Sequence, residues 1–442
     1  VLGLTLILIS IFTFNETTPF PSAYALLPTV GTALVIIGTR PESSLNRLLG
    51  SKTFVTIGIL SYSLYLWHQP ILAFFRQSKT HNLTVYDGTL AIIATFLLSV
   101  LTYKLVETPL RRKTLRRPYL TAMGSVAAAF CVFGIVGHTS NGFAEARFSS
   151  QLLAKLEEAK DGNPLRTQCS ASQYNWNSPI GSCVLGSESL IGNATAALIG
   201  DSHTDAIAYA LHKELLSSDD RVRHLWHSGC VPAEGLYRID KGESDRCLEY
   251  MRNAFSFVKE RENIKTVVLH GRWALQYWGD RFDNTIGGVE LGSRAGMAPA
   301  NWKNASFTEL QRRNAVLDAY KSTVNELLES GKNVVVVHGV PEQGWNVPQH
   351  AFKSRKSDGR LGEVTIPLSV YNERNKQVIS AFEGITHPNL KHIYPAELYC
   401  DEEEKVCYGI RSGNVLYRDD DHLNNKGALD LAREIHSVIE ND

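Results

Sequence analysis

The sequence has no surplus of charge of either sign, because 45 Lys and Arg stand against 45 Asp and Glu in 442 residues. Nucleic-acid-binding domains usually carry a basic surplus, so the composition indicates no nucleic acid partner. None of the seven cysteines forms a Cys-x-x-Cys pair, which disfavours a zinc site, and we expect no metal. The chain also lacks an initiator methionine and a charged leader before its first apolar stretch. We therefore expect it to be the C-terminal part of a longer protein.

Long apolar segments are confined to the part of the chain before about His138, and charged residues are spread throughout the rest. The hydrocarbon core of a bilayer is about 30 Å thick, and a helix rises about 1.5 Å per residue. The last three of the five apolar segments are long enough to cross the bilayer core. The second is shorter, but its place in a series of apolar segments that alternate with polar loops favours a membrane span there as well. The segments are 1–12, 26–38, 54–75, 89–106 and 119–137.

The loops between these segments differ in basic residues. Loop 13–25 has no Lys or Arg, whereas the next loop carries Arg40, Arg47 and Lys52. A second basic stretch consists of Lys104 at the end of the fourth segment and of Arg111, Arg112, Lys113, Arg116 and Arg117 in the loop before the fifth. By the positive-inside rule both basic loops are cytoplasmic. We therefore expect the fifth helix to end on the extracytoplasmic side, with a linker over 139–195 and a globular domain over 196–442.

Cysteine spacing agrees with an oxidising compartment. Six cysteines form local pairs, which we expect to be the disulfides Cys169 with Cys183, Cys230 with Cys247, and Cys400 with Cys407. The seventh, Cys131, lies in the fifth apolar segment, where we expect a buried, inert thiol.

Short β-rich runs alternate with amphipathic stretches beyond residue 195. The predicted strands are 196–199, 222–226, 266–270, 333–337 and 392–394. The predicted helices are 205–216, 245–262, 307–329, 373–382 and 424–439, after a short one at 152–159. This alternation predicts an α/β fold, with a parallel sheet covered by helices on both faces and ligands at the carboxyl ends of the strands.

Ser202 is the first candidate for chemistry, because it follows Gly200-Asp201 at the end of the first predicted strand. An Asp-x-x-His pair, Asp419 and His422, stands before the last helix. Together the three residue types provide a nucleophile, a base and a group that orients the base. The structural alternative is that Ser202 lies in a capping turn and that Asp419 begins a solvated acidic turn.

Two sets of motifs resemble known families. Gly200-Asp201-Ser202-His203 with Asp419-x-x-His422 resembles the SGNH/GDSL hydrolases, which have a flavodoxin-like three-layer fold. The stretches Ser61-Tyr62-Ser63-Leu64-Tyr65-Leu66-Trp67-His68-Gln69-Pro70 and Val106-Glu107-Thr108-Pro109-Leu110-Arg111 resemble late helices of the acyltransferase-3 membrane family. The fusion of the two resembles bacterial O-acyltransferases that modify surface polysaccharides such as the O-antigen of lipopolysaccharide.

The resemblance implies roles for individual residues. Ser202 would be the nucleophile, His422 the general base, and Asp419 the group that fixes the imidazole tautomer. Gly229 would donate to the oxyanion, but His270-Gly271-Arg272-Trp273 lacks the asparagine of the family's third block. Arg272 could replace that asparagine or serve as a structural ion-pair partner, and both alternatives stay open.

The implied function is O-acetylation of a surface polysaccharide by a multi-pass protein of the bacterial inner membrane, with the SGNH domain in the periplasm. The resemblance implies acetyl-CoA as the cytoplasmic donor, no tightly bound cofactor, and the lipid bilayer and a carbohydrate acceptor as partners. An acetylesterase and a non-catalytic glycan-binding domain are the alternatives. The sequence gives no indication of the oligomeric state.

Overall fold

The computed structural model describes residues 2–15, 18–19, 22–39, 42–79, 83–111, 117–170, 181–241, 246–303 and 305–441. Four of the basic residues used above for orientation, Arg40, Arg112, Lys113 and Arg116, lie outside the described residues. The chain divides into two compact units, Val1–Cys131 and Val132–Asp442.

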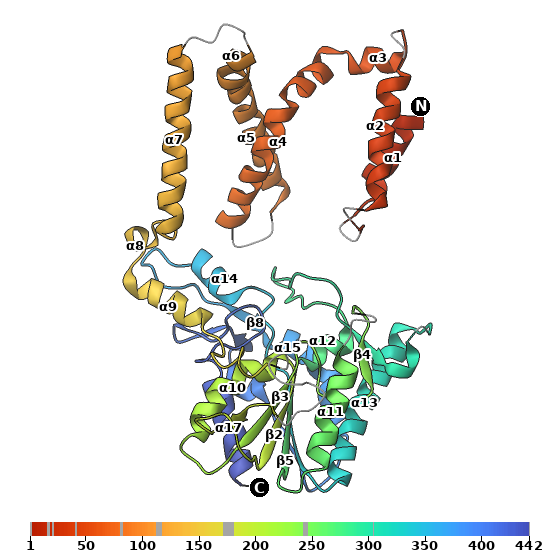
Figure 1. Ribbon diagram of the computed structural model, residues 1–442, viewed down its shortest axis with the longest axis vertical. Helices are drawn as coiled ribbons and strands as arrows, with labels where there is room; N and C mark the ends of the chain where they lie inside the picture. The colour runs from red at the N-terminus through yellow and green to blue at the C-terminus, as the bar shows by residue number, and fades with distance from the viewer. Residues whose placement is uncertain are drawn as a thin grey trace. The chain divides into compact units, whose positions relative to one another are not determined.

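The first unit is helical, and every apolar segment expected from the sequence forms a helix (Figure 1). Its described elements are α1 (Leu2–Thr13), η1 (Ala23–Ala25), α2 (Leu26–Gly38), α3 (Ser44–Leu49), α4 (Lys52–Ser78), α5 (Val85–Thr102), a π-helix (Tyr103–Glu107) and α6 (Thr108–Arg111). The next helix, α7 (Arg117–Thr139), begins in this unit and ends in the second.

Two helical stretches of the described residues are long and apolar enough to cross a membrane, Val85–Leu110 and Leu120–Thr139. α4 is long enough at 27 residues, but polar residues such as Lys52, His68 and Arg76 lower its hydropathy. Large apolar side chains of these helices point outward; Phe130 is 72% exposed, for example. Cys131 is also exposed on α7, so our expectation of a buried thiol was wrong. The reason is that no residue in the most apolar 18-residue stretch of this helix, within Leu120–Thr139, is buried in the protein.

The second unit is built on a six-stranded sheet with the order β1-β3-β2-β5-β7-β9. Its strands are β1 (Val184–Leu185), β2 (Ala196–Gly200), β3 (Val222–Trp226), β5 (Thr266–His270), β7 (Asn333–Val337) and β9 (Leu390–Ile393). Five strands are parallel, and the short edge strand β1 pairs antiparallel with β3. The fold is therefore α/β with a mixed, mostly parallel sheet, which corrects the expected purely parallel one.

Helices cover both faces of this sheet (Figure 1). α10 (Ser202–Leu215) and α17 (Leu429–Glu440) pack on one face, where they bury Leu198 and Val268. α11 (Cys247–Lys259), α12 (Trp273–Trp278), α13 (Glu309–Glu329) and α15 (Leu368–Glu383) pack on the other. Because the central strands are buried on both faces, they appear in the sequence as continuous apolar runs.

The remaining elements of the second unit are short. They are α8 (Ala144–Arg147), α9 (Ser150–Lys160), β4 (Leu236–Arg238), β6 (Met297–Pro299), η5 (Ala300–Trp302), α14 (Val347–Lys353), β8 (Thr365–Pro367), α16 (Pro395–Tyr399), β10 (Cys400–Asp401), β11 (Val406–Tyr408), β12 (Ile410–Arg411) and β13 (Asn414–Val415). All three predicted disulfides are present, Cys169–Cys183, Cys230–Cys247 and Cys400–Cys407.

Numbered along the chain, the five parallel strands have the order 2-1-3-4-5, because β3 and β5 flank β2. Strand order reverses beside β2, and open α/β sheets bind ligands at the carboxyl ends of the strands at such a point. The residues that follow β2, β3 and β5 are therefore placed to form a site.

Candidate active site

Ser202 is held at the junction of β2 and α10. The strand ends at Gly200, where a Cβ atom would lie 1.8 Å from the carbonyl oxygen of His270, so only glycine fits. Asp201 caps the helix, since its carboxylate accepts from the N–H of His203 at 2.8 Å. The other oxygen of Asp201 accepts from the N–H of Arg272 at 2.9 Å. Ser202 is thus the first residue of α10. The turn before it is held by the hydrogen bond between Asp201 and Arg272, which follows the neighbouring strand β5.

The structure brings together the three residues predicted as a triad. His422 Nε2 lies 2.8 Å from Ser202 Oγ, although the two residues are 220 positions apart. His422 Nδ1 lies 3.0 Å from Asp419 Oδ2. Asp419 also shapes its own turn, because Oδ1 accepts from the N–H groups of Asp421 at 3.1 Å and His422 at 2.7 Å. These distances suit proton transfer from the serine to an oriented imidazole.

A second carboxylate, Asp421, lies even closer to the imidazole and was not predicted. Its Oδ1 is 2.8 Å from His422 Nδ1, and its Oδ2 is 3.1 Å from His203 Nε2. The side chain of Asp421 is 5% exposed, against 33% for Asp419. In the sequence, Asp421 belongs to the run Asp419-Asp420-Asp421, but the Asp-x-x-His spacing of the family identifies only Asp419.

Arg272 belongs to a buried ion cluster and is 8% exposed. Its Nε donates to Glu342 at 2.6 Å, and its Nη1 contacts Glu290 and Asp421, both at 2.9 Å. Its Nη2 bonds Glu290 at 2.5 Å and also contacts Glu342. Because every guanidinium nitrogen contacts a carboxylate, the geometry favours the structural ion-pair role over the oxyanion role that we also considered.

Two further arginines complete this cluster. Arg374 Nε donates to Glu342 at 2.9 Å, and Arg281 pairs with Glu290. The cluster therefore contains the cations Arg272, Arg281 and Arg374 and the anions Glu290, Glu342 and Asp421. Because the three positive charges balance the three negative ones, the free-energy cost of burying the cluster is reduced. The contact with Arg272 also holds the carboxylate of Asp421 in place beside His422.

These charges shift the pKa values of the site. Burial disfavours the imidazolium of His422, but the negative charge of Asp421, together with hydrogen bonds and charge from Asp419, outweighs it and raises the pKa above its ordinary value. Burial likewise opposes ionisation of Asp421, but Arg272 and His422 hold its pKa well below the usual range. At neutral pH the resting site therefore favours an ion pair between His422 and Asp421.

The backbone N–H groups of Ser202 and Gly229 are the predicted donors to an oxyanion. Within the described residues, the N–H groups of Ser202 and Gly229 make no hydrogen bond. Gly229 follows β3 and has φ of 72°, a conformation that favours glycine. The positive end of α10 adds to the electrostatic field at Ser202. Gly229 remains the predicted second donor.

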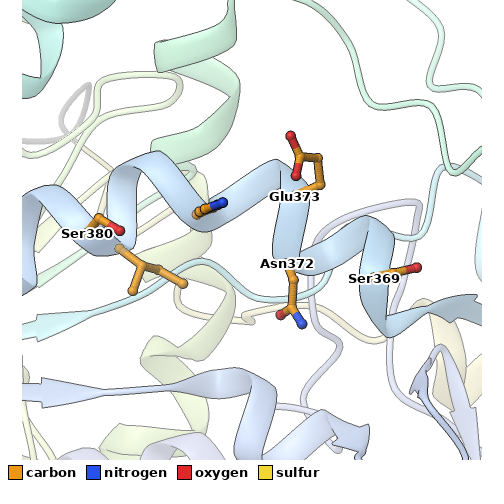
Figure 2. Close-up of a pocket in the computed structure, with 6 residues that line it drawn as sticks. Ser369, Asn372, Glu373 and Ser380 are labelled. Atoms are coloured by element: carbon orange, nitrogen blue, oxygen red, sulfur yellow. The ribbon is translucent and has the colours of Figure 1, made fainter.

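The described residues contain other features that could be taken for sites. His203, Asp421 and His422 are close enough to hold a metal ion, but the oxygens of Asp421 are already hydrogen-bonded to both imidazoles. A hollow of about 440 Å³ lies along α15 and is shown in Figure 2. It is lined by Ser369, Asn372, Glu373, Lys376, Ile379 and Ser380, and it contains no residue of the predicted triad.

Fold and site together define an α/β protein with a Ser-His-carboxylate arrangement at the carboxyl ends of its strands. A family model described as an SGNH domain fused to AT3 domains matches residues 168–437. The chain belongs to this family.

Curated relatives match shorter stretches. The O-acetyltransferase OatA of Staphylococcus aureus is 36% identical over 81 residues, which are 18% of this chain and 13% of that protein. The peptidoglycan O-acetyltransferase OatA of Listeria monocytogenes is 30% identical over 114 residues, 24% of this chain and 18% of that protein. The matches thus span less than a fifth of the length of these relatives.

A solved structure, the periplasmic domain of a Salmonella Paratyphi A lipopolysaccharide acetyltransferase, is similar to this chain. The aligned region includes 56% of this chain and 84% of the Salmonella chain. It is 15% identical, with a TM-score of 0.39.

Proposed function

We propose that this chain is part of an enzyme that O-acetylates a cell-surface polysaccharide through an acetyl-Ser202 intermediate. The observation that carries the proposal is the 2.8 Å contact between Ser202 Oγ and His422 Nε2, with carboxylates at His422 Nδ1. Membership of the SGNH family supports it. The relatives named as O-acetyltransferases support acetyl as the transferred group.

The chemistry follows from these atoms. The neutral imidazole of His422 takes the proton of Ser202 as Oγ attacks the acetyl carbonyl of the donor. Backbone N–H groups of Ser202 and Gly229 stabilise the oxyanion, and His422 returns the proton to the leaving group. A sugar hydroxyl then gives its proton to His422 and attacks the acetyl carbonyl, the bond between the acetyl group and Ser202 Oγ breaks, and His422 returns the proton to Oγ. Asp419 and Asp421 hold the imidazole through both steps.

The first unit supplies the membrane part of the proposal. Its outward-facing apolar side chains and two candidate spans support insertion in a bilayer. We place the multi-pass segment 1–138 in the bacterial inner membrane, with the linker 139–195 and the SGNH domain 196–442, of flavodoxin-like topology, on the periplasmic side. The intact protein would take the acetyl group from cytoplasmic acetyl-CoA through its membrane part and deliver it to Ser202 on the periplasmic side.

A direct assay tests the proposal. The purified chain is incubated with a soluble acetyl ester, with and without fragments of a surface polysaccharide. We expect an acetylated sugar when the acceptor is present. Free acetate alone in both reactions would identify an acetylesterase, and neither product from a folded preparation would favour a glycan-binding domain. Both of these results contradict the transferase proposal.

Substituting Asp421 should change the pH dependence of the reaction. Only neutral His422 accepts a proton, so the rate of the wild type rises as the pH passes through the raised pKa of His422. The change Asp421→Asn removes the carboxylate charge that raises this pKa most. The rising limb of the pH–rate profile should therefore move to lower pH, by about 1 to 3 pH units.

The change Asp419→Asn is the matched control, because the charge of Asp419 is more exposed and better screened by water. Its pH–rate profile should move less. Equal displacement in the two variants, or none in Asp421→Asn, would contradict the role assigned to Asp421.

A further inference from the structure

A hollow of about 570 Å³ on the second unit is surrounded by cations. Its lining includes Arg147, Lys353, Arg355 and Lys356, and its one acidic residue is Asp358. The carboxylate of Asp358 is already paired with Arg360, whose Nε lies 2.7 Å away. Glu363 also lies 3.4 Å from Lys356, but its side chain is 83% exposed. The hollow therefore keeps a positive charge.

Aromatic rings hold the two sides of the hollow together. Phe148, between α8 and α9, packs edge-on against Phe352 of α14, with ring centroids 5.0 Å apart. The guanidinium of Arg355 lies 4.4 Å from the ring of Phe352 and 5.3 Å from that of Phe148. These contacts place the cations in one cluster, although Arg147 and Arg355 are far apart in the sequence.

The chain connects this cluster closely to the end of α7. Arg147 stands eight residues after Thr139, the last residue of α7. The connection is compact: Phe143 packs on Phe133 of α7 with ring centroids 5.7 Å apart, and Arg147 Nη1 donates to the carbonyl oxygen of Gly142 at 3.3 Å. A candidate membrane span, Leu120–Thr139, thus ends within a few residues of the hollow.

We propose that the hollow binds the phosphate groups of anionic phospholipids in the leaflet where α7 ends. Arginine and lysine bind phosphate oxygens through charge-assisted hydrogen bonds, and basic clusters next to a membrane helix attract anionic lipids. Phe148 and Phe352 add apolar surface at the level of the headgroups. Such binding would hold the second unit against the membrane surface. The inference rests on the membrane placement in the proposed function and not on the chemistry of Ser202.

The test uses the full chain in nanodiscs of phosphatidylcholine, with and without phosphatidylglycerol. Amide hydrogen exchange is measured across residues 353–360. We expect several-fold slower exchange with phosphatidylglycerol at low salt, and loss of this protection at high salt. The double change Arg355→Glu and Lys356→Glu should abolish it.

The double change Lys321→Glu and Arg433→Glu is the matched control, because it alters the net charge equally on α13 and α17, which do not line the hollow. It should keep the protection. Equal exchange with and without phosphatidylglycerol would overturn the proposal. Protection by soluble glycerol phosphate would also overturn the proposal, because the hollow would then bind a free anion. Protection only by a prenyl diphosphate would overturn it as well, because the hollow would then bind a glycan carrier.

Hydrolysis of a soluble acetyl ester is followed in the same samples. It should be unchanged in both double variants, and Ser202→Ala should lose it while keeping the lipid-dependent protection. Failure of lipid protection in an active preparation would therefore refute the lipid site alone.

Discussion

Replacing Ser202 by alanine should lower the rate of acetyl transfer by about 10³-fold or more. The change removes the atom that carries the acetyl group and leaves His422 Nε2 without its 2.8 Å partner. The fold should be unaffected, because Asp201 rather than Ser202 caps α10 and alanine is favourable within a helix. The measurement is the initial rate of acetyl-sugar formation, with a thermal unfolding curve to show that the variant is folded.

Ser369→Ala is the matched control for this experiment. Ser369 is also near the N-terminus of a helix, α15, but it is exposed and lies in the hollow that contains no predicted triad residue. We expect its rate to equal that of the wild type. A Ser202→Ala variant with near-normal activity would refute the acetyl-serine intermediate, whatever the control shows.

The sheet could be predicted from the sequence because its central strands are buried on both faces. Runs such as 266–270 and 333–337 were predicted with their observed bounds, since burial on both faces favours nearly continuous apolar residues. The edge strand β1 was missed because two residues, Val184–Leu185, form no recognisable pattern. The last helix begins at Leu429 rather than at Asn424, because Asn424 Oδ1 accepts from the N–H of Gly427 in a turn before it.

The candidate site was predictable only where it follows short motifs. Ser202 and His422 stand in recognisable stretches, and the structure places them 2.8 Å apart. Asp421 could not be ranked above Asp419, because burial, not spacing, distinguishes the two. Glu290 and Glu342 follow no motif and reach Arg272 from positions 18 and 70 residues away. Contacts of that kind depend on the tertiary fold, so one sequence does not reveal them.

Replacing Arg272 by methionine should destabilise the second unit by about 3 to 5 kcal/mol, the usual effect of removing one partner from a buried ion pair. The change leaves Glu290, Glu342 and Asp421 with one cation fewer in a buried environment. In the wild type, burial disfavours the charged form of Arg272. The negative charges of Asp421, Glu342 and Glu290 outweigh this effect and raise the pKa of Arg272 well above its ordinary value. The measurement is the free energy of unfolding of the second unit in denaturant.

Two further variants make this prediction specific. Lys321→Met breaks an exposed pair with Asp318, where Nζ and Oδ1 are 2.9 Å apart, and should cost about 0 to 1 kcal/mol. Adding Glu342→Gln to Arg272→Met should restore part of the lost stability, because it removes one negative charge from a cluster left with three carboxylates and only the two arginines Arg281 and Arg374. If Arg272→Met instead kept the stability of the wild type and lowered only kcat, Arg272 would be an oxyanion donor, since a group that acts only in the transition state leaves folding unchanged.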